Sequence, residues 1–148
     1  MIWGAEDLSA ALGASTNRLE DGTYEFTYQL ARSLCLAGAA AAGVPAFDGI
    51  WSDFRDTAGL AEDATRARRA GFGGKIAIHP DQVAVINDAF SPSAEDIAYA
   101  KRVVAAFEGN PGIGTIGLDG KMLDMPHLKQ ARRVLETAGK VVGSGAVK

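Results

Sequence analysis

Short apolar, strand-like stretches alternate with longer helical segments along this chain, and this alternation restricts the folds that it can adopt. The strand-like stretches lie at residues 1–4, 44–51 and 75–78. The helical segments that follow them lie at about residues 24–42, 57–70 and 81–89. Strands that alternate with helices of this length predict a parallel sheet with helical crossovers. The sequence therefore predicts the α/β fold class.

Local signals set the expected ends of several helices. Gly43 and Gly71 each end one, because glycine adopts the left-handed conformation that follows a helix without strain. Asp56 is the expected N-cap of the helix at 57–70. The segment 91–95 carries a capping signal and opens a further helix with apolar residues at helical spacing. Beyond it, the sequence predicts a glycine-rich link at 109–120, a last helix at about 126–138 and a tail, 139–148, that frays.

The length of the chain leaves two alternatives for the predicted sheet. Three strands are predicted, whereas a complete (β/α)8 barrel needs roughly 250 residues. With 148 residues, of which 47% are hydrophobic, the chain has enough apolar content for a core but is too short for that barrel. It is either a smaller open α/β sheet or part of a barrel.

Charge and composition exclude several classes of partner and location. The net charge is −3 and no basic block stands out, which argues against a nucleic-acid or anionic-membrane partner. The single cysteine, Cys35, cannot form an internal disulfide, and this favours a reducing compartment. Glu6 and Asp7 interrupt the first apolar run, and the longest uncharged stretch, 33–47, is too short to span a bilayer. We therefore expect a soluble, cytoplasmic protein.

A small open ligand-binding domain would need a glycine-rich phosphate loop between strand and helix. The segment after the first strand, Gly4-Ala5-Glu6-Asp7, carries acid where such a loop offers free amides. This alternative is rejected on that ground.

Several short phrases occur in a fixed order from one end of the chain to the other. They are 3–9 with 11–13, 46–49, 53–56 with 59–60, 71–72 with 74–75, 78–80 with 82, 90–93, and 122–126 with 128–131. Together they resemble the motifs of the HpcH/HpaI aldolase and citrate lyase β-subunit superfamily. The last phrase resembles the C-terminal segment of the citramalyl-CoA lyases in that superfamily.

The resemblance implies a partial (β/α)8 TIM barrel followed by a C-terminal helical extension. Residues 1–108 would supply the last three βα units of the barrel, and residues 109–148 the extension or lid. The five strands that precede them in the family have no counterpart in this chain.

The resemblance also implies an activity, a cofactor and partners. Lyases of this family use Mg²⁺ to split a 3-hydroxyacyl-CoA thioester, such as citramalyl-, malyl- or citryl-CoA, into an acyl-CoA and a 2-oxo acid. The implied partners are the CoA thioester and either further copies in a trimer-like homo-oligomer or a complementary N-terminal half. The alternative is a non-catalytic remnant or accessory subunit that associates with such a half.

Two aspartates carry the implied chemistry. Asp7 matches a metal-binding aspartate of the family, while the second ligand, a glutamate on the preceding strand, lies outside this chain. Read from position alone, Asp7 could instead cap the segment that follows it. Glu6 is expected to point away from Asp7 if the pair is extended. Asp124 matches an acid that relatives use at the thioester, and its alternative is the N-cap of the last helix.

Three further residues are candidates for substrate binding. His79 and Pro80 match a phrase beside the CoA-binding region of the family, although a histidine in this position is also a common structural hydrogen-bonding residue. Asp48 ends the second strand and could line the pocket or serve as a turn residue beside Gly49. Lys75 is expected to support the fold.

Overall fold

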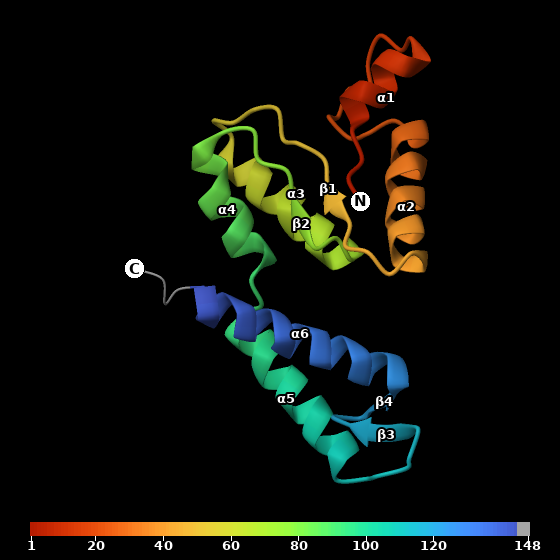
Figure 1. Ribbon diagram of the computed structural model, residues 1–148, viewed down its shortest axis with the longest axis vertical. Helices are drawn as coiled ribbons and strands as arrows, with labels where there is room; N and C mark the ends of the chain where they lie inside the picture. Colours follow the sequence, from red (N-terminus) through yellow and green to blue (C-terminus); the bar gives the residue numbers. More distant parts are fainter. Residues whose placement is uncertain (145–148) are drawn as a thin grey trace. The chain divides into compact units, whose positions relative to one another are not determined.

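The computed structural model describes residues 1–144, and side chains as far as residue 140. Figure 1 shows the order of the elements along the chain. They are α1 (Ala5–Leu12), α2 (Phe26–Ala41), β1 (Phe47–Asp48), α3 (Thr57–Ala70), β2 (Gly74–Lys75), α4 (Pro80–Phe90), α5 (Ala94–Glu108), β3 (Thr115–Leu118), β4 (Lys121–Asp124) and α6 (Met125–Ser144). The chain divides into two compact units, Met1–Phe90 (unit 1) and the residues from Ser91 onward (unit 2).

Unit 1 contains a small parallel sheet between its helices. Strand β1 pairs in parallel with β2, with Asp48 opposite Lys75, and Ile2 forms a parallel bridge to Phe47. Bonds from Gly73 N–H to the Ala46 carbonyl and from Ile76 N–H to the Asp48 carbonyl continue the ladder on both sides. Three parallel segments therefore lie in chain order, each followed by helix, as the sequence predicts.

The two faces of this sheet differ in chemistry, because successive side chains in a strand point to opposite faces. Ile2, Phe47 and Gly74 form one row across the strands. Glycine is required in this row, since a Cβ at Gly74 would lie 2.9 Å from Cδ1 of Phe47. The next row contains Trp3 and the opposed Asp48 and Lys75, and it faces the helices.

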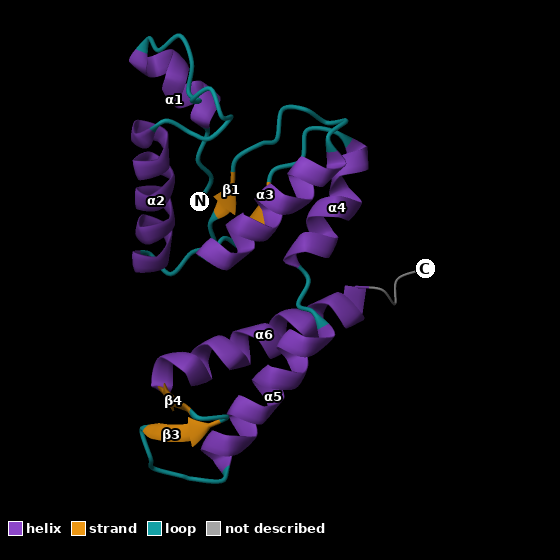
Figure 2. Cartoon of the chain, turned by 180° about the vertical axis from the view of Figure 1, so that it is seen from behind, coloured by secondary structure: helices purple, strands orange, loops and turns teal. Residues whose placement is uncertain are grey.

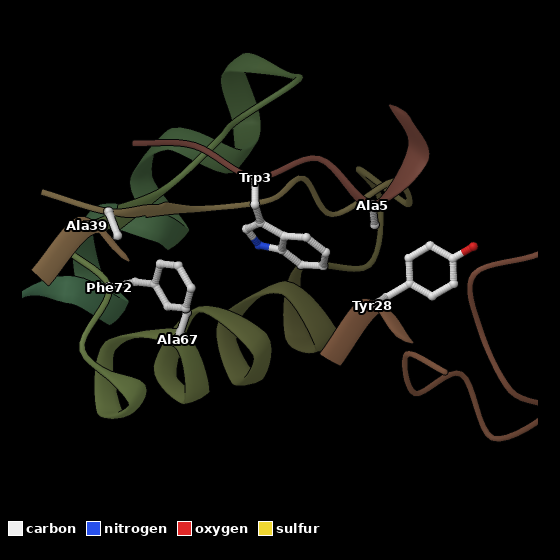
Figure 3. Close-up of a cluster of buried hydrophobic side chains, with 7 residues drawn as sticks. Trp3, Ala5, Tyr28, Ala39, Ala67 and Phe72 are labelled. Carbon is white, nitrogen blue, oxygen red and sulfur yellow. The ribbon is translucent and has the colours of Figure 1, made fainter. Parts of the chain in front are cut away.

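The core of unit 1 lies on that second face (Figure 3). The indole of Trp3 is 6% exposed and lies edge-on to Tyr24, with ring centroids 5.2 Å apart. Around it pack small and aromatic side chains from the helices, namely Ala5, Tyr28, Ala39, Ala46, Ala67 and Phe72. The many alanines allow the helices to lie close to the sheet.

Helix α3 has the ends that its sequence predicts. The carboxylate of Asp56 accepts a hydrogen bond from Gly59 N–H at 2.9 Å, and Gly71 ends the helix with φ +111°. The predicted strands are longer than the observed ones. The sequence predicts that Val83 and Ile86 of the helix at 81–89 face inward, whereas α4 buries Gln82 and Ile86. Val83 is 48% exposed, so that part of the prediction was wrong.

Unit 2 contains two helices, drawn in purple in Figure 2, and a β-hairpin, whose strands are drawn in orange. Helix α5 begins with a capping box between Ser93 and Asp96. Ile116 lies opposite Leu123 in the hairpin, and both belong to a buried cluster with residues of α5 and α6. The remaining members of this cluster are Ala100, Val103, Phe107, Leu128 and Ala131.

The predicted glycine-rich link at 109–120 was wrong in its second half, which forms β3 and the turn of the hairpin. Asp119 and Gly120 have φ values of +53° and +75°, the conformation of a tight two-residue hairpin turn. The predicted fraying tail was also wrong in part, because α6 continues to Ser144. Residues 145–148 of that tail lie outside the described residues.

The structure groups α5 with the C-terminal residues, whereas the predicted boundary between lyase domain and extension lies at residue 108. That boundary refers to a complete enzyme and stays a prediction.

Within residues 1–144 the fold is α/β and no barrel closes. No helix in this range is long and apolar enough to cross a membrane.

Candidate functional site

The parallel strands of unit 1 bring three loops to one edge of the sheet. The carboxyl ends of parallel strands share an edge, and active sites of parallel α/β folds lie there. Ile2 leads to α1 and Asp7, β1 leads to the loop at 49–56, and β2 leads to Ile78 and His79. This edge is the candidate site.

Asp7 lies in the first turn of α1, so the pair Glu6-Asp7 is helical and not extended. The N-cap of α1 is Gly4, so the alternative reading of Asp7 as a cap is wrong. Glu6 and Asp7 are consecutive helical residues, and the expectation that they point to opposite sides of a strand does not apply. An Asn17 amide nitrogen lies 3.5 Å from a Glu6 carboxylate oxygen.

The carboxylate of Asp7 folds back over Gly4. A Cβ placed on Gly4 would lie only 2.6 Å from Oδ2 of Asp7. Gly4 has φ −129°, a conformation open to any residue, so space rather than backbone strain favours glycine there. The side chain of Asp7 is exposed and carries acid at a helix N-terminus, a position where negative charge is stabilised. Its carboxylate is therefore accessible to solvent at the candidate edge.

Gln82 joins the two loops that follow β1 and β2. Its side-chain oxygen accepts from Ile78 N–H at 2.8 Å, and its side-chain nitrogen donates to the carbonyl of Trp51 at 2.9 Å. Gln82 is fully buried. Because both ends of its amide are used by backbone groups, it fixes the relative position of these loops at the candidate edge.

His79 and Phe54 form a stacked pair on these same loops. Their ring centroids lie 4.6 Å apart with 21° between the planes. Nδ1 of His79 accepts from Asp81 N–H at 3.2 Å, so the neutral ring carries its proton on Nε2. Pro80 is the exposed first residue of α4, where proline is well tolerated. The stacked rings and Pro80 form an accessible wall beside the loops.

Asp48 is buried on the helix-facing side of the sheet, with 2% of its surface exposed. Its Oδ1 accepts from Trp3 Nε1 at 2.7 Å and from Arg32 Nε at 2.8 Å, and its Oδ2 accepts from Arg32 Nη2 at 2.9 Å. Lys75 Nζ lies 3.5 Å from Oδ2 of Asp48 and 2.7 Å from Oδ2 of Asp63. Asp48, Arg32, Lys75 and Asp63 are called the ionic quartet below.

The ionic quartet keeps Asp48 charged. Burial acts to raise the pKa of Asp48, but the hydrogen bond from Arg32, the charge of Lys75 and the hydrogen bond from Trp3 outweigh it, and the pKa lies below its ordinary value. The hydrogen bond to Asp48 in turn raises the pKa of Arg32. Lys75 is buried in this quartet and supports the fold as expected. The carboxylate of Asp48 is engaged by Trp3 and Arg32, and it lies on the face of the sheet opposite to the row of Ile2, Phe47 and Gly74.

Asp124 lies at the end of β4 in unit 2, directly before α6. Its Oδ1 lies 2.5 Å from Nδ1 of His127, and its backbone N–H lies 3.1 Å from the same nitrogen. Nδ1 can accept from the N–H or donate to the carboxylate, but it cannot do both at once. Asp124 and His127 therefore form a contacting pair, and their side chains are about half exposed.

Asp7 is the predicted metal ligand of the candidate edge. No group of three or more His, Cys, Asp or Glu side chains able to hold an ion occurs among the described residues. The exposed carboxylate of Asp7 is of the ligand type that Mg²⁺ prefers, since this ion takes a few carboxylate oxygens and keeps several waters.

Gln82, His127 and Arg32 had no assigned role from the sequence. Gln82 appeared there only as part of a family phrase, and His127 had no evident partner. Arg32 is the single charged residue of α2, and a lone charge in an otherwise apolar or uncharged helix is the signal that indicates a buried ion pair.

Comparison with known proteins gives a family match over nearly the whole chain. Residues 4–143 match the model of a family described as C-C bond lyase of the TIM-barrel fold. A citrate lyase subunit beta-like protein of Mycobacterium tuberculosis is 41% identical over 140 residues, which cover 95% of this chain and 50% of that protein. The mitochondrial citramalyl-CoA lyase of Homo sapiens is 38% identical over 143 residues, covering 95% of this chain and 41% of that protein.

A solved structure agrees with these matches. The crystal structure of the protein CitE from Mycobacterium tuberculosis in complex with magnesium, acetoacetate and coenzyme A aligns with a TM-score of 0.84 at 41% identity. The alignment covers 94% of this chain and 51% of that one. The chain thus spans about half the length of the relatives that it matches.

Proposed function

Because the chain belongs to the C-C bond lyase family of the TIM-barrel fold, we propose that it supplies part of a CoA-ester lyase. Its three parallel segments would be the last three βα units of the barrel, and residues 109–148 the C-terminal extension. The substrate would be a 3-hydroxyacyl-CoA thioester of the citramalyl, malyl or citryl type. The observation that carries the proposal is the match of residues 4–143, together with the exposed carboxylate of Asp7 at the catalytic edge of the sheet.

Asp7 would hold a divalent cation through its free carboxylate oxygens. Asp7 lies in the first turn of α1, with its carboxylate beside Gly4. Magnesium, when bound, supplies positive charge that stabilises the oxyanion formed as the carbon–carbon bond breaks. The presence of magnesium in the related CitE structure supports this assignment.

Asp124 would transfer a proton at the thioester end of the substrate. Cleavage removes the proton of the 3-hydroxyl group and leaves an acyl-CoA carbon that must gain one. The contact with His127 gives Asp124 a partner that can hold or accept that proton. In the proposed enzyme Asp124 acts in the site of a neighbouring subunit of a trimer-like oligomer.

The wall of His79, Phe54 and Pro80 would face the CoA part of the substrate. Stacked rings on an exposed surface suit the flat and apolar groups of such a ligand. The buried carboxylate of Asp48 is engaged by Trp3 and Arg32, and we therefore leave it out of this wall.

The test uses the lyase assembled with its complementary half, assayed for cleavage of citramalyl- and malyl-CoA. We expect Asp124→Asn to retain metal binding and lose turnover, and Asp7→Ala to abolish the dependence on Mg²⁺. Asp88→Asn, an exposed carboxylate of α4, serves as the control and should change neither. Unchanged turnover in Asp124→Asn would return Asp124 to the role of a helix cap.

A non-catalytic accessory subunit is the second candidate function. It is favoured by the lack, among the described residues, of three side chains that could bind one ion. An assembled complex in which Asp7→Ala leaves Mg²⁺-dependent activity intact would support this candidate.

A further inference from the structure

The indole of Trp3 connects the sheet to the beginning of α1. Its Nε1–H donates to Oδ1 of Asp48 at 2.7 Å, and its ring lies edge-on to that of Tyr24. Figure 3 shows Trp3 within the buried cluster that also contains Ala67 and Phe72. A tryptophan fixed by a hydrogen bond at one edge and by packing along the ring has little freedom to rotate. The backbone that leaves Trp3 therefore starts from a defined point.

Few residues separate this fixed point from Asp7. Gly4 is the N-cap of α1 and accepts from Leu8 N–H at 3.2 Å, and Ala5 is 1% exposed. Each of these residues is held by packing or by a helix hydrogen bond. The backbone between Trp3 and the first turn of α1, which carries Asp7, is therefore anchored on both sides.

The charge of Asp48 makes the bond to Trp3 a strong one. Hydrogen bonds to an ionised acceptor are about twice as strong as those between neutral groups. Arg32 and Lys75 neutralise the buried carboxylate, and Asp63 balances the second cation. The ionic quartet therefore holds an acceptor of full charge under the indole.

We propose that Asp48 is a positioning residue that fixes the metal ligand Asp7 through the indole of Trp3. This inference depends on the proposed function, in which Asp7 binds a divalent cation. It replaces the substrate-binding role first considered for Asp48, because this side chain is buried beneath the sheet among Trp3 and Arg32 rather than exposed to a ligand.

The test compares two identical substitutions in the 148-residue chain. Trp3→Phe removes the Nε1–H donor and leaves the ionic quartet intact. Trp51→Phe makes the same change at an indole whose buried Nε1 has no hydrogen-bond partner among the described residues. Mn²⁺, a paramagnetic substitute for Mg²⁺, is titrated into ¹⁵N-labelled protein, and the broadening of the amide signals of Glu6, Asp7 and Leu8 is followed.

We expect Trp3→Phe to raise the Mn²⁺ concentration needed for half-broadening about tenfold, the lower end of the effect of removing groups that orient metal ligands. Trp51→Phe should match the wild type. Equal midpoints for the two variants and the wild type would overturn the proposal. Equal losses in both variants would also overturn it, because the effect would then come from the smaller ring and not from the hydrogen bond.

A third variant separates this failure from failure of the proposed function. Asp7→Asn should abolish the local broadening. If it does not, Asp7 is not the metal ligand and the proposed function fails. If it does while Trp3→Phe binds Mn²⁺ normally, the proposed function stands and only the positioning role is lost.

Should Trp3→Phe unfold, β-(3-benzothienyl)alanine at position 3 takes its place. This residue keeps the fused ring and its volume but replaces N–H by sulfur, so the core remains filled. The same tenfold shift is expected, and a normal midpoint would overturn the proposal.

Discussion

Asp48 shows how a single buried charge can be stabilised by its neighbours. Taking a carboxylate out of water costs several kcal/mol unless hydrogen bonds and opposite charge compensate for it. Arg32 provides two hydrogen bonds, Trp3 a third, and Lys75 a charge 3.5 Å away. The charges of the ionic quartet, in which Asp63 also contacts Lys75, compensate for one another. Removal of one charge therefore leaves its partners without an opposite charge.

We expect Asp48→Asn to lower the free energy of unfolding by about 3–5 kcal/mol, the usual cost of breaking a buried ion pair. Urea unfolding followed by tryptophan fluorescence measures the change. Asp88→Asn, at an exposed position, should stay within about 0.5 kcal/mol of the wild type. A loss below about 1 kcal/mol in Asp48→Asn would show that water reaches the quartet.

The stability of the chain should also fall at acid pH because of Asp48. Its folded pKa is lower than the unfolded value of about 3.9, so the folded state holds the charged form more firmly. Charged Asp48 contributes fully to the free energy of unfolding above its unfolded pKa, and this contribution is lost as the pH falls through its folded pKa. Unfolding measured from pH 7 to pH 2.5 should show a steeper decline below about pH 4 in the wild type than in Asp48→Asn.

Gly4→Ala tests whether space at Gly4 sets the position of Asp7. The new Cβ would meet Oδ2 of Asp7 at 2.6 Å, and the flexible carboxylate can move away at small cost. We expect nearly unchanged stability but weaker Mn²⁺ binding. Gly38→Ala, with nothing within 4 Å of its new Cβ, should leave Mn²⁺ binding unchanged. Equal binding in both variants would show that Asp7 needs no such support.

At the level of helices and strands, local chemistry explains the helix ends better than the strand lengths. Asp56, Gly71 and Ser93 act where the sequence predicts because capping needs only neighbours within one turn. The hairpin was missed although its turn carries Asp119-Gly120, the strongest short signal for a tight hairpin. The glycines of 109–120 predicted a link there, and that range includes β3 and the turn.

Ser93→Ala should destabilise unit 2 by about 1 kcal/mol, since α5 loses the acceptor for Asp96 N–H. Ser93→Asn retains an acceptor and serves as the control with a change of a few tenths of a kcal/mol. Thermal unfolding followed by circular dichroism measures both. Equal destabilisation by the two variants would assign the effect to something other than the cap.

At the scale of the whole molecule, each unit has its own hydrophobic cluster. The cluster of unit 1 surrounds Trp3, and that of unit 2 includes Val103, Phe107 and Leu123. Both tryptophans of the chain, Trp3 and Trp51, lie in unit 1. Tryptophan fluorescence therefore reports on unit 1, while circular dichroism reports on the helices of both units.

Leu123→Ala should destabilise unit 2 by about 2–5 kcal/mol, because it removes a buried side chain from the second cluster. We expect the circular dichroism transition to acquire an earlier phase while the fluorescence midpoint stays unchanged. Leu60→Ala in unit 1, also buried, should shift the fluorescence midpoint. A fluorescence midpoint that shifts in Leu123→Ala would show that the two clusters unfold together.

The sequence by itself determined the α/β class, most helix ends and the family, because periodicity, caps and motif order depend on residues close together in the chain. Tertiary structure decided the rest. It placed Asp7 in a helix over Gly4, brought His127 to Asp124, and buried Asp48 with Arg32 and Lys75 from separate elements. Side-chain partners of this kind depend on distances between elements, and such distances exist only once the chain has folded.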